Sequence, residues 1–142
     1  MNISAKTEYA CIAVLELAAR YDQCRPVRIR DIAEANGIPS RFLVQILLQL
    51  KSAGIVGSTR GAAGGYQLVK PPSEITLSDV MTVCDGNASE PITSVERESA
   101  SSRTLMSAWQ EVAAVQREML EATTFAALVE QAAEQSDNMY YI

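Results

Sequence analysis

The sequence has 142 residues, of which 48% are hydrophobic, so it can bury a real core as one compact domain or as a small domain with a helical extension. It lacks both an apolar run near the ~20 residues that a bilayer span needs and the apolar stretch of a signal peptide, so we expect a cytoplasmic protein without a membrane partner. The net charge of −5, taken over the whole chain, argues against a nucleic-acid binder, and the absence of histidine excludes a histidine-based catalytic or zinc site.

The first residues predict an amphipathic helix. Ser4 can cap this helix, and hydrophobic side chains recur on one face as far as about Arg20. The predicted inward face contains Tyr9, Ile12, Ala13 and Leu17. Residues 24–28 include Pro26 and are typical of a connector, so the helix should end before them.

Two further helices are predicted, joined by a glycine turn. The first is short and ends at the turn of Asn36 and Gly37. Its apolar side contains Ile29, Ile32 and Ala33. Pro39 favours a new helix start, and residues 40–53 give the clearest helical pattern of the chain before Gly54 ends it. The apolar face of this helix is predicted to contain Phe42, Leu43, Ile46, Leu47 and Leu50.

The pattern then changes from helical to extended. Residues 55–59 form a short β-branched run, residues 60–65 a glycine-rich turn, and residues 66–69 a second extended run. These features predict a β-hairpin, which Pro71 and Pro72 separate from the second half of the chain. The predicted fold class is therefore mainly α with a small β-hairpin.

The second half is predicted to be helical with one long interruption. Thr76 and Asp79 form an Asp variant of a capping box, which opens a short helix with Leu77, Val80 and Met81 inward and an end near Cys84. Residues 85–102 are polar and predict a mobile loop. A long helix is expected over residues 103–122, and Thr124 can cap a last helix.

The long helix carries an apolar stripe that one small domain cannot cover. A helix of this length spans roughly 30 Å at ~1.5 Å per residue. We therefore predict that the stripe pairs with a second copy of the chain to form a homodimer. The predicted dimerisation residues are Leu105, Trp109, Val112, Gln116 and Met119.

Charge is distributed unevenly along the chain. Residues 1–70 contain nine Lys or Arg and five Asp or Glu, a net charge of +4, whereas residues 71–142 contain three and twelve, a net charge of −9. A basic first half can approach phosphates while an acidic second half is held away from them. The alternative is that these charges only solvate helical surfaces.

Two short helices joined at a glycine and followed by a hairpin are typical of a winged helix-turn-helix, whose second helix enters the major groove of DNA. On the outer face of residues 40–53, Arg41 can donate to guanine, Gln45 can pair with adenine, and Val44 could touch a thymine methyl. The same surface also includes Ser40, Leu48, Gln49 and Ser52. The alternative is an ordinary solvated helix face.

Basic residues outside this helix are further candidates for DNA contacts. Arg60 lies at the tip of the glycine-rich turn, where its guanidinium could enter a minor groove and Gly61 allows close approach. Candidates for phosphate contacts are Lys6, Arg28, Arg30 and Lys51. We therefore divide the chain into a winged helix-turn-helix DNA-binding domain, residues 1–72, and a second segment, residues 73–142, that holds the linker helix, the loop and the dimerisation or effector-sensing helices.

Several motifs resemble one family of regulators. Residues 7–10 (TEYA), 31–34 (DIAE), 37–39 (GIP) and especially 56–68 (VGSTRGAAGGYQL) look like the winged helix-turn-helix family typified by IscR, NsrR and CymR, and the similarity covers nearly the whole chain. The resemblance implies a homodimer clasped by the long helix, a palindromic operator on double-stranded DNA, the segment from Arg41 to Gln45 in the major groove and Arg60 in the minor groove. It implies a transcription regulator, expected to be a repressor. An enzyme is not expected, because the sequence shows no histidine, no phosphate-binding loop and no nucleophile beside a recognisable base.

Iron–sulfur members of this family carry three cysteines in the loop that corresponds here to residues 86–104. No cysteine lies in that interval, and thiolate-held clusters normally need about four protein ligands. Glu8 matches a position that supplies a carboxylate ligand in some members, but Glu8, Cys11 and Cys84 would form an incomplete site. We therefore expect no cofactor.

The signal that the protein senses stays open between a small-molecule effector, a protein partner and a thiol-based redox switch. Three cysteines at these spacings favour free thiols over a disulfide framework. Cys84 lies at a helix C-terminus beside Asp85, where the dipole and the carboxylate should disfavour ionisation. A protein-interaction module without a DNA role is the alternative function, and Arg41 with Arg60 argues against it.

Overall fold

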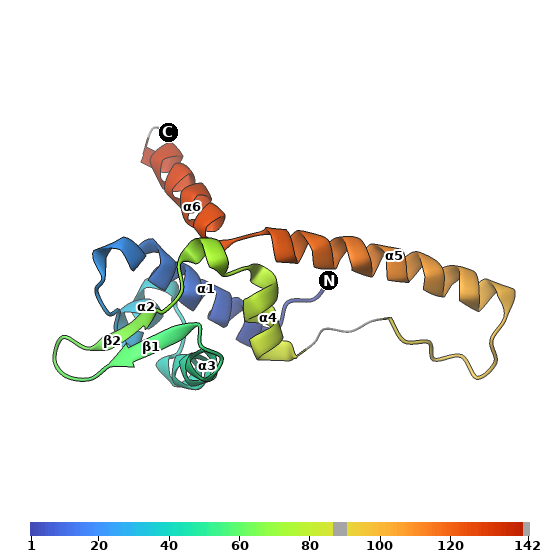
Figure 1. Ribbon diagram of the computed structural model, residues 1–142, viewed down its shortest axis with the longest axis horizontal. Coiled ribbons are helices and arrows are strands. Elements are labelled where there is room, and N and C mark those ends of the chain that lie inside the picture. The colour runs from blue at the N-terminus through green and yellow to red at the C-terminus, as the bar shows by residue number, and fades with distance from the viewer. Residues whose placement is uncertain (87–90, 141–142) are drawn as a thin grey trace.

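The computed structural model describes residues 1–86 and 91–140, and side chains as far as residue 136. Figure 1 shows α1 to α4 and the hairpin gathered together, with α5 extending away from them. The helices are α1 (Ala5–Ala19), α2 (Ile29–Asn36), α3 (Ser40–Ser52), α4 (Leu77–Asp85), α5 (Ala100–Ala122) and α6 (Phe125–Tyr140), with short 3-10 turns η1 (Tyr21–Gln23) and η2 (Pro72–Glu74). Strands β1 (Val56–Thr59) and β2 (Gly65–Leu68) pair antiparallel. The predicted fold class is confirmed.

Helix starts coincide with the capping residues that the sequence shows. The Ser4 hydroxyl accepts a hydrogen bond from the Thr7 backbone N–H at 3.1 Å. In α4, the Thr76 backbone N–H donates to the Asp79 carboxylate at 2.9 Å, and the Asp79 backbone N–H donates to the Thr76 hydroxyl at 3.2 Å. Both predicted caps are therefore confirmed, because each satisfies backbone donors that the first helical turn leaves unpaired.

The long helix α5 begins at Ala100, earlier than the predicted start at Arg103. Its cap is a reciprocal pair, in which Ser99 Oγ accepts from the Ser102 backbone N–H and Ser102 Oγ accepts from the Ser99 backbone N–H. The predicted loop over residues 85–102 is correspondingly shorter, since Asp85 belongs to α4 and residues 100–102 to α5. Residues 91–99 form no helix or strand, and residues 87–90 of the predicted loop lie outside the described residues.

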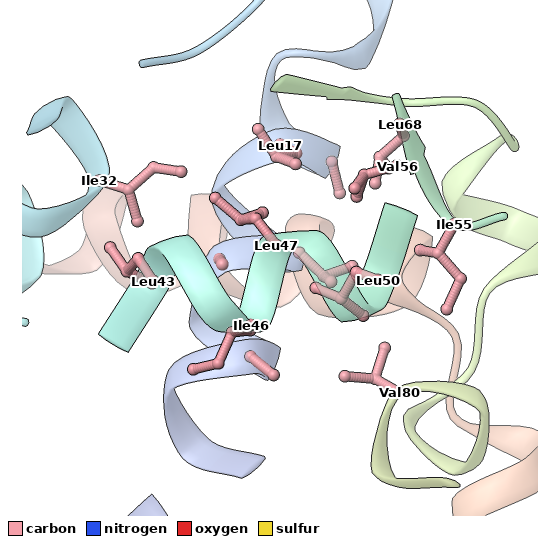
Figure 2. Close-up of a cluster of buried hydrophobic side chains, with 14 of the residues drawn as sticks. Leu17, Ile32, Leu43, Ile46, Leu47, Leu50, Ile55, Val56, Leu68 and Val80 are labelled. Atoms are coloured by element: carbon pink, nitrogen blue, oxygen red, sulfur yellow. The ribbon is translucent and has the colours of Figure 1, made fainter. Parts of the chain in front are cut away.

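One buried core joins most of the elements. Figure 2 shows Leu43, Ile46, Leu47 and Leu50 of α3 among side chains that come from other elements, including Leu17, Ile32 and Val80. Burying a side chain of this size contributes about 1.5–3 kcal/mol. Phe125, at the start of α6, is fully buried in the same core and was not predicted there from the sequence. The core therefore includes residues from both halves of the chain.

Two predicted inward faces are rotated in the structure. Phe42 is 44% exposed because the buried stripe of α3 consists of Leu43, Ile46, Leu47 and Leu50, and a neighbouring residue points about 100° away from it. In α1, Tyr9 and Ile12 are only partly buried. Its buried residues are Thr7, Ala10, Ala13, Val14, Leu17 and Ala18. Three of these six buried residues are alanines, so half of the buried side chains of α1 are small.

Backbone hydrogen bonds connect α6 to the start of α4. The Leu77 N–H donates to the Thr123 carbonyl at 3.0 Å, and the Phe125 N–H donates to the Ile75 carbonyl at 2.9 Å. Thr124 caps α6 by accepting from the Ala127 N–H at 3.2 Å, as predicted. These bonds place the end of α5 beside the start of α4. Among the described residues, no helix is long and apolar enough to cross a bilayer.

Candidate nucleic-acid interface

The turn between α2 and α3 sets the orientation of α3. Gly37 has a left-handed φ of 65°, and the next residue, Ile38, donates its N–H to the Ala33 carbonyl at 3.1 Å. Such a conformation favours glycine because it has no Cβ. Ile32, Ala33 and Ile38 are buried around this turn and hold α2 against α3. The packing leaves one face of α3 directed to solvent.

The exposed face of α3 contains the side chains that the sequence predicts to read DNA. It combines a cation, two amides and two apolar side chains on successive turns, opposite the buried stripe. The exposed residues of this face are Ser40, Arg41, Val44, Gln45, Leu48, Gln49 and Ser52. Arginine and glutamine can each make two hydrogen bonds to one base edge, and an apolar side chain can contact a thymine methyl. The face therefore carries groups suited to the major groove.

The exposed aromatic ring of Phe42 makes two contacts beside this face. The Arg41 Cζ lies over the Phe42 ring, 4.9 Å from its centroid. Tyr9 of α1 stacks with the same ring at a centroid distance of 6.1 Å and an interplanar angle of 28°. This cluster was not predicted, because the helical pattern assigns both aromatic residues to the core, and only the rotation of the two helices brings them together at the surface.

The hairpin forms a wing whose turn contains Arg60 and Gly61, both exposed. The wing is attached to the rest of the domain through Val27, which exchanges two backbone hydrogen bonds with Tyr66 at 2.7 and 2.8 Å. Gly65 lies directly against this strand-like segment, and a Cβ there would be 2.5 Å from the Val27 carbonyl oxygen. At Gly64 a Cβ would be 2.2 Å from the Thr59 carbonyl oxygen. The two glycines therefore allow close backbone packing.

Two of the predicted phosphate-contacting residues also bind the wing. Lys51, in the last turn of α3, donates to the Ser58 hydroxyl of β1 at 2.7 Å. Arg28, just before α2, donates to the Ala62 carbonyl in the wing turn. Both side chains are at exposed positions, as is Arg30, whereas Lys6 is half-buried. Arg28 and Lys51 therefore link the wing to the helix-turn-helix, and their phosphate contacts stay a prediction.

The predicted dimerisation stripe is exposed in the single chain. Helix α5 has no fully buried residue, and Leu105, Trp109, Val112 and Met119 are each more than half exposed. Val115 is exposed as well and was not predicted. Gln116 differs, because it is half-buried and lines a cleft of about 760 Å³ between the N-terminal segment, α4 and α5. Four of the five predicted residues thus form an uncovered apolar stripe.

That the protein binds no iron–sulfur cluster stays a prediction. Within residues 1–86 and 91–136, no group of three or more His, Cys, Asp or Glu side chains could hold a metal ion. Burial raises the pKa of Cys11 to about 11, with a smaller contribution from the nearby Cys84. A thiol must lose its proton to act as a nucleophile, so burial makes Cys11 a poor nucleophile. The absence of cysteines from residues 86–104 supports the prediction that no cluster is bound.

The pKa of Cys84 is raised, as the sequence predicts, but mainly for another reason. Burial is the largest cause, and Asp85 adds a smaller effect in the same direction. Lys6 opposes it by stabilising the thiolate. Cys24 lies elsewhere, exposed at the end of η1 with a left-handed φ of 51°. The three cysteines of the chain are all free.

Comparison with known proteins places the chain in a family. The model for "Rrf2: Iron-dependent Transcriptional regulator" matches residues 3–131. The regulator CymR of Bacillus subtilis is 34% identical over 143 residues, with full coverage of both chains. An rrf2-like regulator of Rhodobacter capsulatus is 45% identical over 86 residues, which cover 59% of this chain and 57% of that protein.

Solved structures agree with this assignment. The structure of CymR, the global cysteine regulator of B. subtilis, has a TM-score of 0.81 and 32% identity, with coverage of 92% of this chain and 98% of that chain. The structure of T. potens IscR has a TM-score of 0.76 and 29% identity, with coverage of 95% and 90%. With its exposed α3 face and its wing, the chain therefore belongs to the Rrf2 family of winged helix-turn-helix regulators, which bind DNA and control transcription.

Proposed function

We propose that the protein is a homodimeric repressor that binds a palindromic operator, with α3 in the major groove and the wing in the adjacent minor groove. The observation that carries this proposal is the outer face of α3, where Arg41, Val44 and Gln45 are exposed directly opposite a fully buried stripe. The packing of α3 against the core prevents this face from turning inward. Its side chains are therefore available to a ligand that presents base edges.

The wing supports the same orientation. Because the Lys51 ammonium donates to Ser58, β1 is held beside the last turn of α3. The turn after β1 carries Arg60, whose guanidinium can enter a minor groove, where the negative potential attracts it. Ser40, Gln49, Arg28, Arg30, Lys51 and Gly61 are proposed as surrounding contacts to phosphates and sugars.

Dimer formation is supported by α5. In a monomer, Leu105, Trp109, Val112 and Met119 would leave a continuous apolar stripe in water, and such stripes usually mark interaction sites. Pairing of two copies about a twofold axis would cover the stripe and place two α3 helices on two half-sites. An inverted-repeat operator results from this symmetry. In this arrangement residues 1–72 serve DNA binding, and residues 73–142 serve assembly and sensing.

Arg41→Ala and Gln45→Ala are expected to relax base preference, each at a defined operator position. A bidentate contact to a base discriminates by ~1–3 kcal/mol, so each variant should lose roughly 5- to 150-fold of discrimination at its own position. The operator would be selected from random DNA, and the affinity of each variant would then be measured on every single-base change. Arg30→Ala is the matched control, because loss of a phosphate contact should weaken all sequences equally and reduce the salt dependence. Uniform losses for Arg41→Ala and Gln45→Ala would contradict base reading.

We also propose that the protein binds DNA without an iron–sulfur cluster. After anaerobic reconstitution with iron and sulfide and then desalting, we expect no visible absorption band and no stoichiometric iron, because the interval 86–104 contains none of the cysteines that hold the cluster in iron–sulfur members of the family. The affinity for the selected operator should be the same before and after this treatment. A coloured product with bound iron would contradict the proposal. The small-molecule effector and the protein partner stay predictions.

A further inference from the structure

We propose that Phe42, supported by Tyr9, positions the guanidinium of Arg41 and thereby determines base specificity at the operator position that Arg41 reads. The proposal rests on the proposed function of Arg41. It assigns Phe42 as a positioning residue, which acts through Arg41, and it extends the reading surface beyond the exposed face of α3 to an aromatic residue of α1.

Phe42 lies at the surface of α3. Its ring is 44% exposed although α3 has a well-formed buried stripe immediately beside it. A single exposed apolar side chain is ordinary, whereas a cluster of them at the surface indicates a functional role. Phe42 does so, because the Tyr9 ring stacks on it at a centroid distance of 6.1 Å. Tyr9 itself packs against the core from α1, so the Phe42 ring rests on a fixed neighbour.

Arg41 contacts this ring. The Arg41 Cζ lies over the Phe42 ring, 4.9 Å from its centroid, within the range of a cation–π interaction. Consecutive side chains of a helix point about 100° apart, so the contact forms because the long Arg41 side chain reaches over the ring. Within the described residues, no carboxylate forms an ion pair with Arg41.

The guanidinium can contact an aromatic ring and a base at the same time. Its five N–H donors lie in the plane of the group, so contact through its face with an aromatic ring leaves the donors free for the O6 and N7 atoms of guanine. A flexible arginine loses rotamer freedom when it is fixed on a base, and a side chain that is already held loses less. Phe42 can therefore raise affinity for the correct base without touching DNA itself.

The test compares Phe42→Leu, Phe42→Tyr and Phe42→Leu combined with Arg41→Ala. Affinity would be measured on the selected operator and on single-base changes at the position where Arg41→Ala relaxes preference. We expect Phe42→Leu to lose about two- to fivefold of discrimination at that position only, from the size of an exposed cation–π contact. Phe42→Tyr keeps the aromatic ring and should retain the discrimination. In the Arg41→Ala background, Phe42→Leu should have no further effect.

Ile92→Ala is the control, because Ile92 is an exposed apolar residue that lies outside α3 and outside the proposed DNA contacts. Thermal unfolding midpoints of all variants would show whether folding is affected. If Arg41→Ala relaxes preference but Phe42→Leu does not, this inference is wrong while base reading by Arg41 stands. If Phe42→Leu still weakens binding without Arg41, or weakens all sequences equally, Phe42 contacts DNA or supports the fold, and the inference is wrong. If Arg41→Ala leaves base preference unchanged, the proposed function itself fails at this residue.

Discussion

Replacement of Trp109 by aspartate is expected to convert the protein to monomers and to abolish tight operator binding. Trp109 lies in the middle of the exposed stripe of α5 and is 55% exposed in the single chain. In the proposed dimer it would be covered by the second copy, and an unpaired carboxylate buried there costs several kcal/mol. A cost of about 3 kcal/mol corresponds to roughly a 150-fold weaker dimer.

Sedimentation equilibrium at micromolar concentration would measure the change in assembly, and binding to full and half operators would measure its effect on DNA recognition. Gln110→Asp is the matched control, because it adds the same charge at the neighbouring exposed position, about 100° around the helix from the stripe. The control should remain dimeric. A wild-type protein that is monomeric under these conditions, or a Trp109→Asp variant that remains dimeric, would contradict the role of α5.

Replacement of Gly64 by alanine is expected to displace the wing and to weaken operator binding by about tenfold or more, the size of one lost specific DNA contact. The new Cβ would lie 2.2 Å from the Thr59 carbonyl oxygen and 2.9 Å from the Arg60 carbonyl carbon. Both are backbone atoms and cannot move like a flexible side chain. The turn would have to open, which would break the hydrogen bond from the Gly64 N–H to the Gly61 carbonyl at 3.0 Å.

Ala63→Ser is the control for this variant, since it changes the exposed neighbour in the same turn. Arg60→Ala is the second comparison, because it removes the cation and leaves the turn intact. We expect it to weaken specific binding with the dimer unchanged. Far-ultraviolet circular dichroism should show that the helices are retained in all three variants. Wild-type affinity of both Gly64→Ala and Arg60→Ala at physiological salt would exclude the wing from the DNA interface.

The sequence predicted which side chains of the site are exposed, but not all of their contacts. The exposed face of α3 was predicted correctly at Arg41, Val44 and Gln45, because the spacing of buried leucines in a helix defines the opposite face. The partners of Arg28 and Lys51 could not be predicted. Arg28 is 34 residues from Ala62 along the chain, and its contact depends on the position of the wing turn beside the segment that precedes α2. Whether any of these side chains contacts DNA stays a prediction.

Features that arise within a few residues of each other could be predicted from the sequence. Ser4 caps α1, Thr76 and Asp79 cap α4, and Gly37 forms the turn before α3, because each of these arrangements needs only local backbone geometry. The long helix and the hairpin are determined by the period of their hydrophobic residues in the same way.

The rotation of each amphipathic helix about its axis, and the contacts between distant segments, depend on how the whole chain packs. Periodicity locates an apolar face within about one residue, which is about 100° on a helix, so Phe42 was predicted inward and lies at the surface. Phe125 is buried in the core. Its backbone N–H pairs with the carbonyl of Ile75, 50 positions earlier in the sequence. The free energy of such contacts depends on surfaces that the whole fold brings together. It therefore cannot be derived from a local sequence pattern.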